Sequence, residues 1–267
     1  MNLLKRELAP ILPDAWTRID AEAARVLRVH LAGRKLVDFR GPFGWAFAAV
    51  NTGRLNLDVA DPIAGVNAGL RIVQPLMELR TPLLLDILEL DAAARGGDNP
   101  NLLPIVHAAK LMAKAEDTAI FLGYPAAGIS GIIPASPHAP ILVKDATHLP
   151  LCVVEAIGKL RAGGVGGPYG LTLGTPLYEA LTAATEEGYP VLNRVERVLV
   201  GGRIVHAPAM EGGVLLSIRG GDYELTVGQD LSIGYAHHTK VRVELYLTES
   251  FTFRILEPAA AVVLRVA

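Results

Sequence analysis

Seven histidines and a single cysteine, Cys152, are the side chains best suited to metal binding or nucleophilic chemistry. No histidine has a second histidine, a cysteine or a carboxylate at a ligand spacing such as H-E-x-x-H. His237 and His238 follow a strand-like run, which predicts a solvated turn. Cys152 shares an apolar helical stripe with Val153 and Ile157, so we expect a buried small hydrophobe. The sequence predicts no metal site and no catalytic residue.

Three other segments have the composition of a ligand site without its spacing. Residues 163–168 read GGVGGP, which matches neither G-x-x-x-x-G-K-[ST] nor G-x-G-x-x-G, and a strand-like run over 169–173 follows. A turn is the better interpretation. Ser130 stands in G-I-S-G and misses the G-x-S-x-G pattern of a nucleophile elbow. Alternating charges near position 90 are typical of a solvated or interfacial strand face: Asp86, Glu89 and Asp91.

Helices are expected over much of the chain. Apolar residues recur at helical spacing from Pro13 to Gly33, and Asp14 is placed to cap the free amides at the start. The apolar face of this helix includes Val26, Leu27, His30 and Leu31. Three further helices are expected over 101–122, 147–162 and 175–187.

Near the C-terminus the period of the apolar residues changes from 3.6 to 2. Residues 241–255 alternate between apolar and polar positions, and Glu249 is the one residue that interrupts the apolar series. This pattern predicts a half-buried strand of about 15 residues, where about 5 or 6 is usual. Such a strand suits an extended wall better than a small enzyme core.

Residues 50–80 show no helical stripe. Glycine and proline separate two strand-like pieces over 54–59 and 71–80. A structureless insertion of roughly 30 residues is unusual inside a compact domain, so we predict a two-stranded arm. An isolated hairpin is marginal in water, and the arm therefore needs a neighbour to lie on.

The composition gives a second indication of assembly. Only 19% of the 267 residues are charged, 51% are hydrophobic and the net charge is −2. A typical soluble domain is about 25% charged. A soluble chain of this kind must cover apolar surface, which favours a homo-oligomer.

Charge distribution excludes other classes of partner. The sequence has no cluster of lysine and arginine, so we do not expect it to bind nucleic acid. Charges at Lys5, Arg6 and Glu7 argue against a secretory signal, and the glycines and prolines in the uncharged stretch 118–143 argue against a membrane span. The lone cysteine fits a reducing compartment, so a cytoplasmic location is expected.

Several phrases, in this order, resemble the encapsulin nanocompartment shell proteins. The resemblance covers essentially the whole chain, and GQDLSIGY is its most specific string. The phrases are KRELAPI at 5–11, LAGRKLVD at 31–38, GPFGW at 41–45, GPY at 167–169, RGGDY at 219–223, GQDLSIGY at 228–235 and ESFTF at 249–253.

The resemblance implies an α+β fold of the tailed-phage major-capsid type. It implies a peripheral domain, an axial domain and an extended loop that embraces the next subunit. The expected ranges are 1–49 for the N-terminal helix of the peripheral domain, 50–80 for the extended loop, 81–132 for the spine helix of the peripheral domain, 133–227 for the axial domain and 228–267 for the C-terminal strands of the peripheral domain.

The function implied by the resemblance is containment. Family members form closed icosahedral shells in the bacterial cytoplasm and capture cargo enzymes through short C-terminal targeting peptides. The cargo is often a ferritin-like protein or a peroxidase, which links the family to iron storage and oxidative stress. A peptide needs an apolar groove with a few polar groups. The residues expected to form it are Val26, Leu27, His30, Leu31, Arg34, Asp38, Asp230, Leu231 and Ile233.

Two further expectations concern pores and cofactors. In this fold the loop after the fourth helix lies at the five-fold axis, which predicts a weakly cation-selective pore formed by Thr185, Glu186, Glu187 and Gly188. Some family members stack a flavin on a tryptophan at the base of the extended loop. Leu88 stands at that place here, so we expect no flavin.

Two alternatives remain open at the level of sequence. A phage or prophage major capsid protein would share the fold, although such proteins commonly begin with a scaffolding extension. A secreted peptidase or bacteriocin-like protein is disfavoured by the lack of a nucleophile, metal pattern and export signal. The short length favours the smallest icosahedral lattice.

Overall fold

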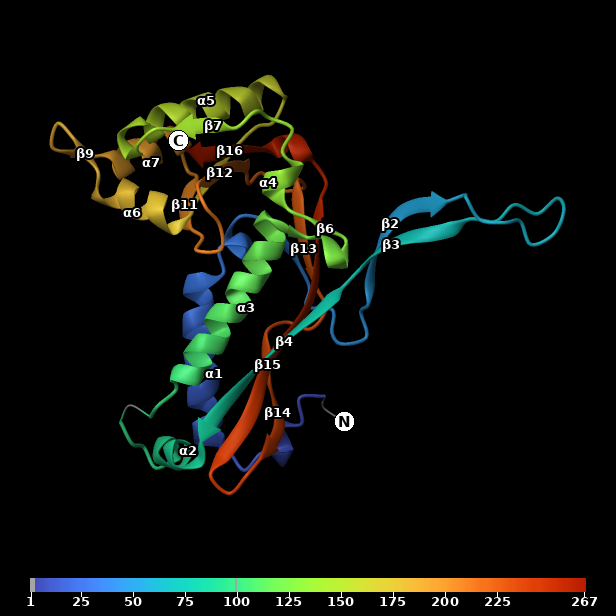
Figure 1. Cartoon of the computed structure of the whole chain (residues 1–267), viewed down its shortest axis with the longest axis vertical. Helices are drawn as coiled ribbons and strands as arrows, with labels where there is room; N and C mark the ends of the chain where they lie inside the picture. Colours follow the sequence, from blue (N-terminus) through green and yellow to red (C-terminus); the bar gives the residue numbers. More distant parts are fainter. Residues whose placement is uncertain (1–2, 99) are drawn as a thin grey trace.

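The computed structural model describes residues 3–98 and 100–267, which form a long body, a head and an arm (Figure 1). The α-helices are α1 (Pro13–His30), α2 (Ile87–Ala94), α3 (Leu103–Phe121), α4 (Ile132–Ala135), α5 (Leu149–Ala162), α6 (Thr175–Ala183) and α7 (Val191–Leu199). Short 3-10 turns are η1 (Arg6–Leu8), η2 (Gly33–Lys35), η3 (Pro125–Ala127), η4 (Ala146–His148) and η5 (Pro258–Ala260).

The strands divide among the three parts. Those of the long body are β1 (Asp38–Arg40), β4 (Met77–Asp86), β13 (Tyr223–Val227), β14 (Ser232–His238) and β15 (Arg242–Ile255). Those of the head sheet are β7 (Ile141–Val143), β8 (Tyr169–Leu173), β11 (Arg203–His206), β12 (Gly213–Ser217) and β16 (Ala261–Val266). The arm is β2 (Ala49–Asn56) with β3 (Leu70–Pro75), and two short hairpins pair β5 (Gly123–Tyr124) with β6 (Ile129–Ser130) and β9 (Thr185–Glu186) with β10 (Tyr189–Pro190).

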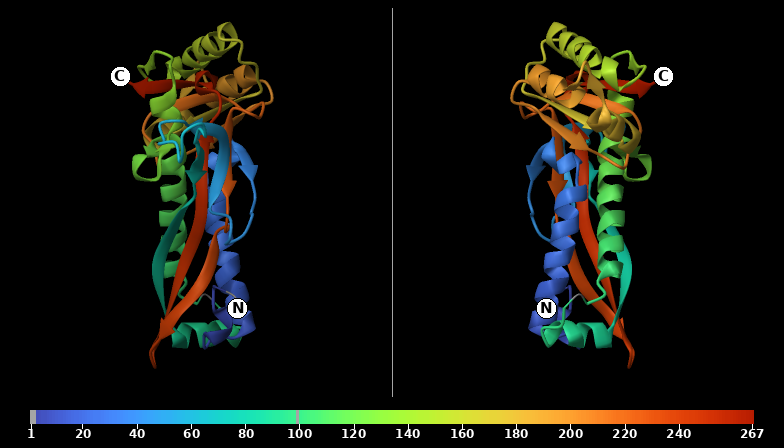
Figure 2. Two further views of the ribbon diagram at one scale, coloured as in Figure 1. Left: turned by 90° about the vertical axis from the view of Figure 1, so that its right-hand side faces the viewer. Right: turned by 90° about the vertical axis from the view of Figure 1, so that its left-hand side faces the viewer.

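Strand β15 organises the sheet of the long body. Antiparallel β4 pairs along one side of it, while β13 and β14 pair one after the other along the opposite side. The short strand β1 adds to β13 in parallel. Helices α1 and α3 pack together and cover one face of this sheet (Figure 2). The 14-residue length of β15 confirms the long strand predicted from the period of two.

The interior consists of two hydrophobic cores. One lies between the sheet and helices α1 and α3 and contains Val243, Leu245 and Leu247 of β15. The other continues into the head and contains Phe251 and Phe253 of the same strand. Elements β15 and α3 run through both cores, so the long body and the head share a continuous framework.

The helix limits correct several expectations. Helix α1 begins with Leu12 as its N-cap and Pro13 in the first turn, so the predicted Asp14 cap is wrong. The acidic segment near position 90 is helix α2 and not a strand: Asp86 caps it by accepting from the Leu88 amide. Helix α6 ends at Ala183 because the chain turns into the β9–β10 hairpin, and α7 follows.

The sheets also divide the chain differently from the expected domain ranges. β13 lies within the range expected for the axial domain, yet it pairs with β15 in the long body. β16 lies within the range expected for the peripheral domain, yet it pairs with β12 and β7 in the head. The apolar run Ala261–Leu264 is buried throughout, as a central strand covered on both faces requires.

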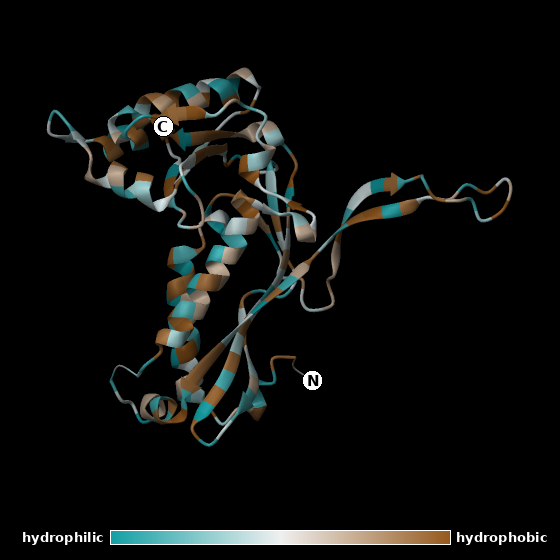
Figure 3. Cartoon of the chain, in the orientation of Figure 1, coloured by the Kyte–Doolittle hydropathy of each residue, from teal (hydrophilic) through white to brown (hydrophobic). Residues whose placement is uncertain are grey.

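The arm projects well beyond the rest of the subunit (Figure 1). Its two strands pair only with each other among the described residues, as expected for 50–80, although β2 begins earlier and β3 ends earlier than predicted. Hydrophobic residues gather along β3 and toward the tip (Figure 3). Several are more than half exposed: Leu55, Leu57, Ile63 and Leu70. Among the described helices, none combines the length and hydropathy that a bilayer crossing requires.

Candidate functional site

The C-terminal end of α1, the turn η2 and the start of β14 meet at one surface, which we call the α1–β14 surface. His30 ends α1, Arg34 lies in η2, and Asp230 and Leu231 lead into β14. Arg34 Nη1 donates to Asp230 Oδ1 at 2.9 Å and thereby ties the helix end to the strand. Sequence positions nearly 200 residues apart are brought together here, as the predicted peptide site requires.

The apolar residues predicted for this site differ in their exposure. Val26, Leu27, Leu31 and Ile233 are each less than 9% exposed and belong to the core of the long body. They form the floor beneath the surface. Leu231 and His30 are half-buried, and Leu231 packs against the same core. Of these six residues, Leu231 and His30 are therefore the ones still partly accessible in the single subunit.

Arg34 is the centre of a buried ion-pair network. Its Nε donates to both carboxylate oxygens of Glu116 at 3.0 and 2.8 Å, and its Nη2 donates to Glu249. The carboxylates of Glu116 and Glu249 are completely buried. Burial opposes the charge of Arg34, but Glu116, Glu249 and Asp230 together raise its pKa above the usual range. Arg34 is a fixed cation.

Asp117 on α3 holds the segment that joins α1 to η2. Its carboxylate accepts hydrogen bonds from the backbone amides of Ala32 at 3.0 Å and Gly33 at 2.8 Å. Burial raises its pKa to about 7, against the opposing effect of these two hydrogen bonds. A Cβ on Gly33 would lie 2.5 Å from Ile120 Cδ1, so the close approach of η2 to α3 requires glycine.

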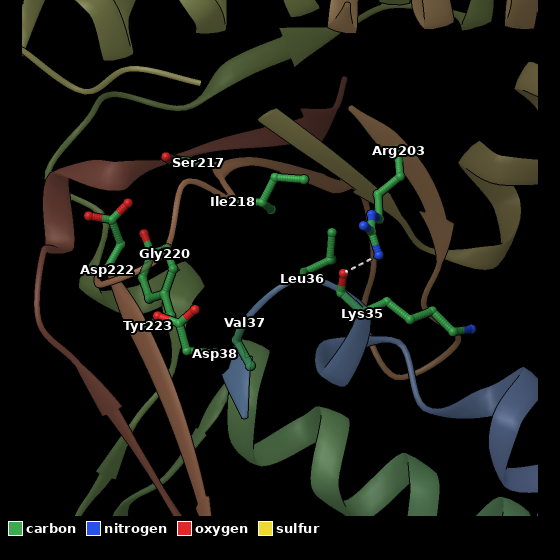
Figure 4. A pocket seen from close by; sticks show the side chains of 10 residues that line it. All are labelled: Lys35, Leu36, Val37, Asp38, Arg203, Ser217, Ile218, Gly220, Asp222 and Tyr223. Carbon is green, nitrogen blue, oxygen red and sulfur yellow. Dashed lines mark hydrogen bonds between the residues drawn. The ribbon is translucent and has the colours of Figure 1, made fainter. Parts of the chain in front are cut away.

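Arg34 pairs with Glu116, Glu249 and Asp230, whereas Asp38 has other partners. It lines a small polar cavity of about 120 Å³ between the long body and the head, with Lys35, Arg203, Gly220 and Tyr223 (Figure 4). Its carboxylate accepts from the Gly221 amide at 2.5 Å, and Arg203 Nη1 donates to the Lys35 carbonyl at 3.0 Å. In this structure Asp38 fixes the loop before β13.

The predicted pore residues form the tip of a hairpin. Thr185 and Glu186 are in β9, and both Glu187 and Gly188 have positive φ, which matches a two-residue type I′ turn. All four are exposed. The Glu186 carboxylate pairs with Arg194 of α7. The hairpin projects from the head on the side opposite the arm (Figure 1).

The remaining candidate residues have structural surroundings. Cys152 is buried on α5, with Sγ facing the Leu142 carbonyl, and burial raises the pKa of its thiol. His237 and His238 are exposed but end strand β14, so the predicted turn starts later. Within residues 3–98 and 100–267 no group of three or more metal-ligating side chains is clustered. Leu88 on α2 is 72% exposed and offers no ring for stacking a flavin, so the residues present do not fit that group.

The sequence did not predict the roles of Glu116 and Asp117, nor the ion pair of Glu249 with Arg34. The interruption of the apolar series at Glu249 was the available signal, because strand alternation directs this carboxylate into the interior. A weaker signal was the presence of two adjacent acids, Glu116 and Asp117, in the helix expected over 101–122.

Solved structures with a similar fold show which class of protein this is. The chain superimposes on the virus-like particle from Pyrococcus furiosus with a TM-score of 0.64 and 16% identity, covering 94% of this chain and 99% of that one. For Gordonia phage Cozz the TM-score is 0.57 at 11% identity, covering 89% and 87%. The fold is thus that of the tailed-phage major-capsid proteins, which build shells.

Sequence comparison identifies the family within that class. A family model described as "Encapsulating protein for peroxidase" matches residues 1–252. The type 1 encapsulin shell protein of Rhodospirillum rubrum is 48% identical over 99% of this chain and 97% of its own length. That of Mycolicibacterium paratuberculosis is 45% identical over 98% of each. The chain belongs to the encapsulin shell proteins.

Family membership decides between the alternatives left open by the sequence. The chain is a structural shell protein and not an enzyme, which removes the secreted peptidase. Its relatives at 45% and 48% identity are encapsulins, which favours the compartment over a phage or prophage capsid. The predicted α+β capsid-type fold is confirmed.

Proposed function

We propose that this chain forms a closed icosahedral shell and captures a cargo enzyme at the α1–β14 surface through the cargo's C-terminal targeting peptide. The observation that carries the proposal is the tie between Arg34 and Asp230 beside half-buried Leu231. It places a rigid charged pair next to apolar surface. A peptide with aliphatic side chains needs both kinds of contact.

The sheet edge adds backbone groups to this surface. Among the described residues, β14 pairs with β15 alone and forms the edge of the sheet. The Leu4 carbonyl accepts from the Tyr235 amide, so the turn before η1 already occupies part of this edge. A cargo peptide would lie nearer the start of β14, where Leu231 and the Arg34–Asp230 pair are found.

The cargo class and location extend this proposal. A ferritin-like protein or a peroxidase is the expected cargo, and the description of the matching family model supports a peroxidase. The compartment would work in the cytoplasm without a bound flavin. The arm would lie on a neighbouring subunit, since several of its apolar side chains are more than half exposed and its two strands pair only with each other among the described residues.

Loading of a tagged reporter tests the docking surface. A fluorescent protein ending in an aliphatic-rich targeting peptide is co-expressed with the shell protein, and the reporter-to-shell ratio of purified particles is measured. We expect Leu231→Asp to lower loading about tenfold, because a carboxylate would be buried against the peptide's apolar side chains. Electron microscopy checks that hollow, uniform particles still form.

A matched control separates docking from general damage. Leu88→Asp introduces the same charge at a 72% exposed leucine on α2, away from the α1–β14 surface, and should leave loading unchanged. Normal loading of intact Leu231→Asp shells would rule out this surface as the docking site.

A further inference from the structure

The two hydrophobic cores are separated by a polar seam. On β15, Glu249 stands between Leu247 in the core of the long body and Phe251 in the core of the head. On α3, Glu116 stands between Ala113 and Ala119, which likewise belong to different cores. After α1 the chain changes core between Leu31 and Ala32, two residues before Arg34. The two long elements, β15 and α3, therefore change core at a buried glutamate, and Arg34 reaches both of these residues.

The seam has more acids than it can neutralise. Arg34 contacts Glu116, Glu249 and Asp230, and Asp117 lies beside them on α3. Lys35 influences Asp117 from η2 but does not replace Arg34 as the partner of the buried pair. Asp230 is partly exposed to solvent, but Glu116, Glu249 and Asp117 are buried. If these three were all ionised, the seam would hold three buried negative charges around one guanidinium, and a surplus of buried charge is costly.

Glu249 shows how the surplus is relieved. Its Oε1 accepts from Arg34, but its Oε2 is buried and has no donor within the described chain. The carboxylate of Glu116 contacts the same Arg34 nitrogen, Nη2, so the two buried carboxylates lie side by side. Two carboxylates can form a hydrogen bond only if one of them carries a proton. An orphaned buried oxygen beside a second carboxylate is thus the geometry of a protonated acid.

We propose that Glu249 and Glu116 share one proton, held on Glu249 Oε2 and donated to Glu116, and that this pair clamps Arg34 as a pH-sensitive latch between the two cores. The proton is taken from water as the subunit folds and returns to water when the seam opens. Burial together with the neighbouring charge of Glu116 raises the pKa of Glu249 well above its usual range, and Arg34 opposes this.

The latch has a defined direction with pH. An acid whose pKa is higher in the folded state binds its proton more tightly there, so stability falls as pH rises above the unfolded value of about 4.5 toward the folded value. Loss of the proton leaves Arg34 facing two buried carboxylates that repel each other. The connection of η2 to α3 and β15 should therefore loosen on the alkaline side.

Thermal unfolding of assembled shells tests the latch. Glu249→Gln keeps a donor toward Glu116 and an acceptor for Arg34 while removing the titration. We expect wild-type and variant shells to melt at similar temperatures at pH 5.5, and the variant to melt progressively higher as pH increases to 9. A variant that melts lower by a constant amount across this range would overturn the proposal.

Glu224 in the same sheet offers a matched control. Its two carboxylate oxygens contact Arg254 at 2.5 Å and Arg40 at 2.9 Å, so it has a cation for each oxygen. Glu224→Gln weakens both ion pairs without relieving repulsion between acids. Its melting temperature should be below wild type throughout, with no gain at high pH.

Infrared spectroscopy supplies a readout that packing alone would not change. Wild-type shells at pH 8.5 should show the carbonyl stretch of an un-ionised carboxyl group, which disappears on unfolding and is missing from Glu249→Gln shells. This pH lies above the pKa of about 7 for Asp117, so Asp117 should not contribute to the band. Should the variant fail to assemble, absence of the band from wild-type shells still refutes the shared proton.

Discussion

Single residues at the polar seam explain why the corner after α1 is rigid. Arg34 meets three carboxylates, and Asp117 holds the amides of Ala32 and Gly33 from below. Removing one partner of such a network leaves a buried charge uncompensated, which costs several kcal/mol in proteins. The geometry at the α1–β14 surface therefore depends on residues that do not themselves reach it.

Asp117→Asn should change the pH dependence of stability. The pKa of Asp117 is raised from 3.8 to about 7, so the folded state binds the proton more tightly and this group's contribution falls as pH rises from about 4 to about 7. Its limiting slope is about 1.4 kcal/mol per pH unit. An asparagine cannot titrate and has one acceptor oxygen for two amides, so the variant should be less stable at pH 4.

Melting temperatures of wild-type and Asp117→Asn shells between pH 4 and 8 check this expectation. The deficit of the variant should shrink as pH rises toward 7, because only the wild type loses stability through this titration. A deficit that grows with pH would show that Asp117 is ionised and stabilising throughout.

At the residue scale, the sequence predicts some members of the polar seam but not the seam itself. Glu249 stood out as a break in strand alternation, and Arg34 and Asp230 were expected at one site. Their ion pair is present. Glu116 and Asp117 could not be assigned because which helix face meets η2 depends on tertiary packing. The resemblance also groups Asp38 with this site, and its carboxylate accepts from the Gly221 amide and lines a polar cavity.

Among the elements, the arm differs most from an ordinary loop. It is a hairpin without a third strand among the described residues, and its leucines face solvent in the single subunit. Two-stranded hairpins are marginal alone, and exposed apolar patches mark contact surfaces. The arm is therefore suited to binding a neighbouring subunit.

A double substitution on the arm should prevent assembly without unfolding the subunit. Leu57 and Leu70 are 71% and 64% exposed, so Leu57→Asp with Leu70→Asp removes apolar contact surface while leaving both cores intact. We expect subunits with unchanged circular dichroism that elute as small species and show no particles in electron micrographs. Asp58→Asn on the same arm is the control and should assemble. Normal particles from the double variant would contradict this role.

The strength of local patterns determined which elements were predictable. Residues 241–255 and 101–122 have long, regular periods and were placed to within a residue or two. Helix α2 has only eight residues, and its charges resembled a strand ladder. No element is predicted over 191–199, although Val191, Val195 and Leu199 mark one buried face of helix α7.

For the whole molecule, the charge deficit of the sequence is explained by the exposed apolar surface of one subunit. Leucines on the arm, Leu122 beside the head and Leu142 on the edge strand β7 are all exposed. A shell covers such surfaces by symmetry, and closed symmetry also repeats each exposed tip into a ring. We propose that the exposed β9–β10 hairpin lies at such a symmetry axis, so that its acidic side chains form a ring.

An acidic ring at this tip should assist cation entry. Glu186 is paired with Arg194, whereas Glu187 lies at the turn itself, so Glu187 should supply most of the field. We expect Glu186→Ala with Glu187→Ala to slow iron entry several-fold, measured as mineral formed by a ferritin-like cargo in intact shells. Glu179→Ala, which removes an exposed carboxylate on α6, serves as the control. Unchanged uptake in the double variant would exclude the acidic pore.

Strand β15 has a mechanical consequence for a wall built from such subunits. It is bonded to β4 along one side and to β13 and β14 along the other, with Glu249 near the middle of its length. Tension along this strand acts on two ladders in shear, so many hydrogen bonds carry the load together instead of breaking one at a time. Each subunit should therefore resist stretching most strongly along the direction of its own β15.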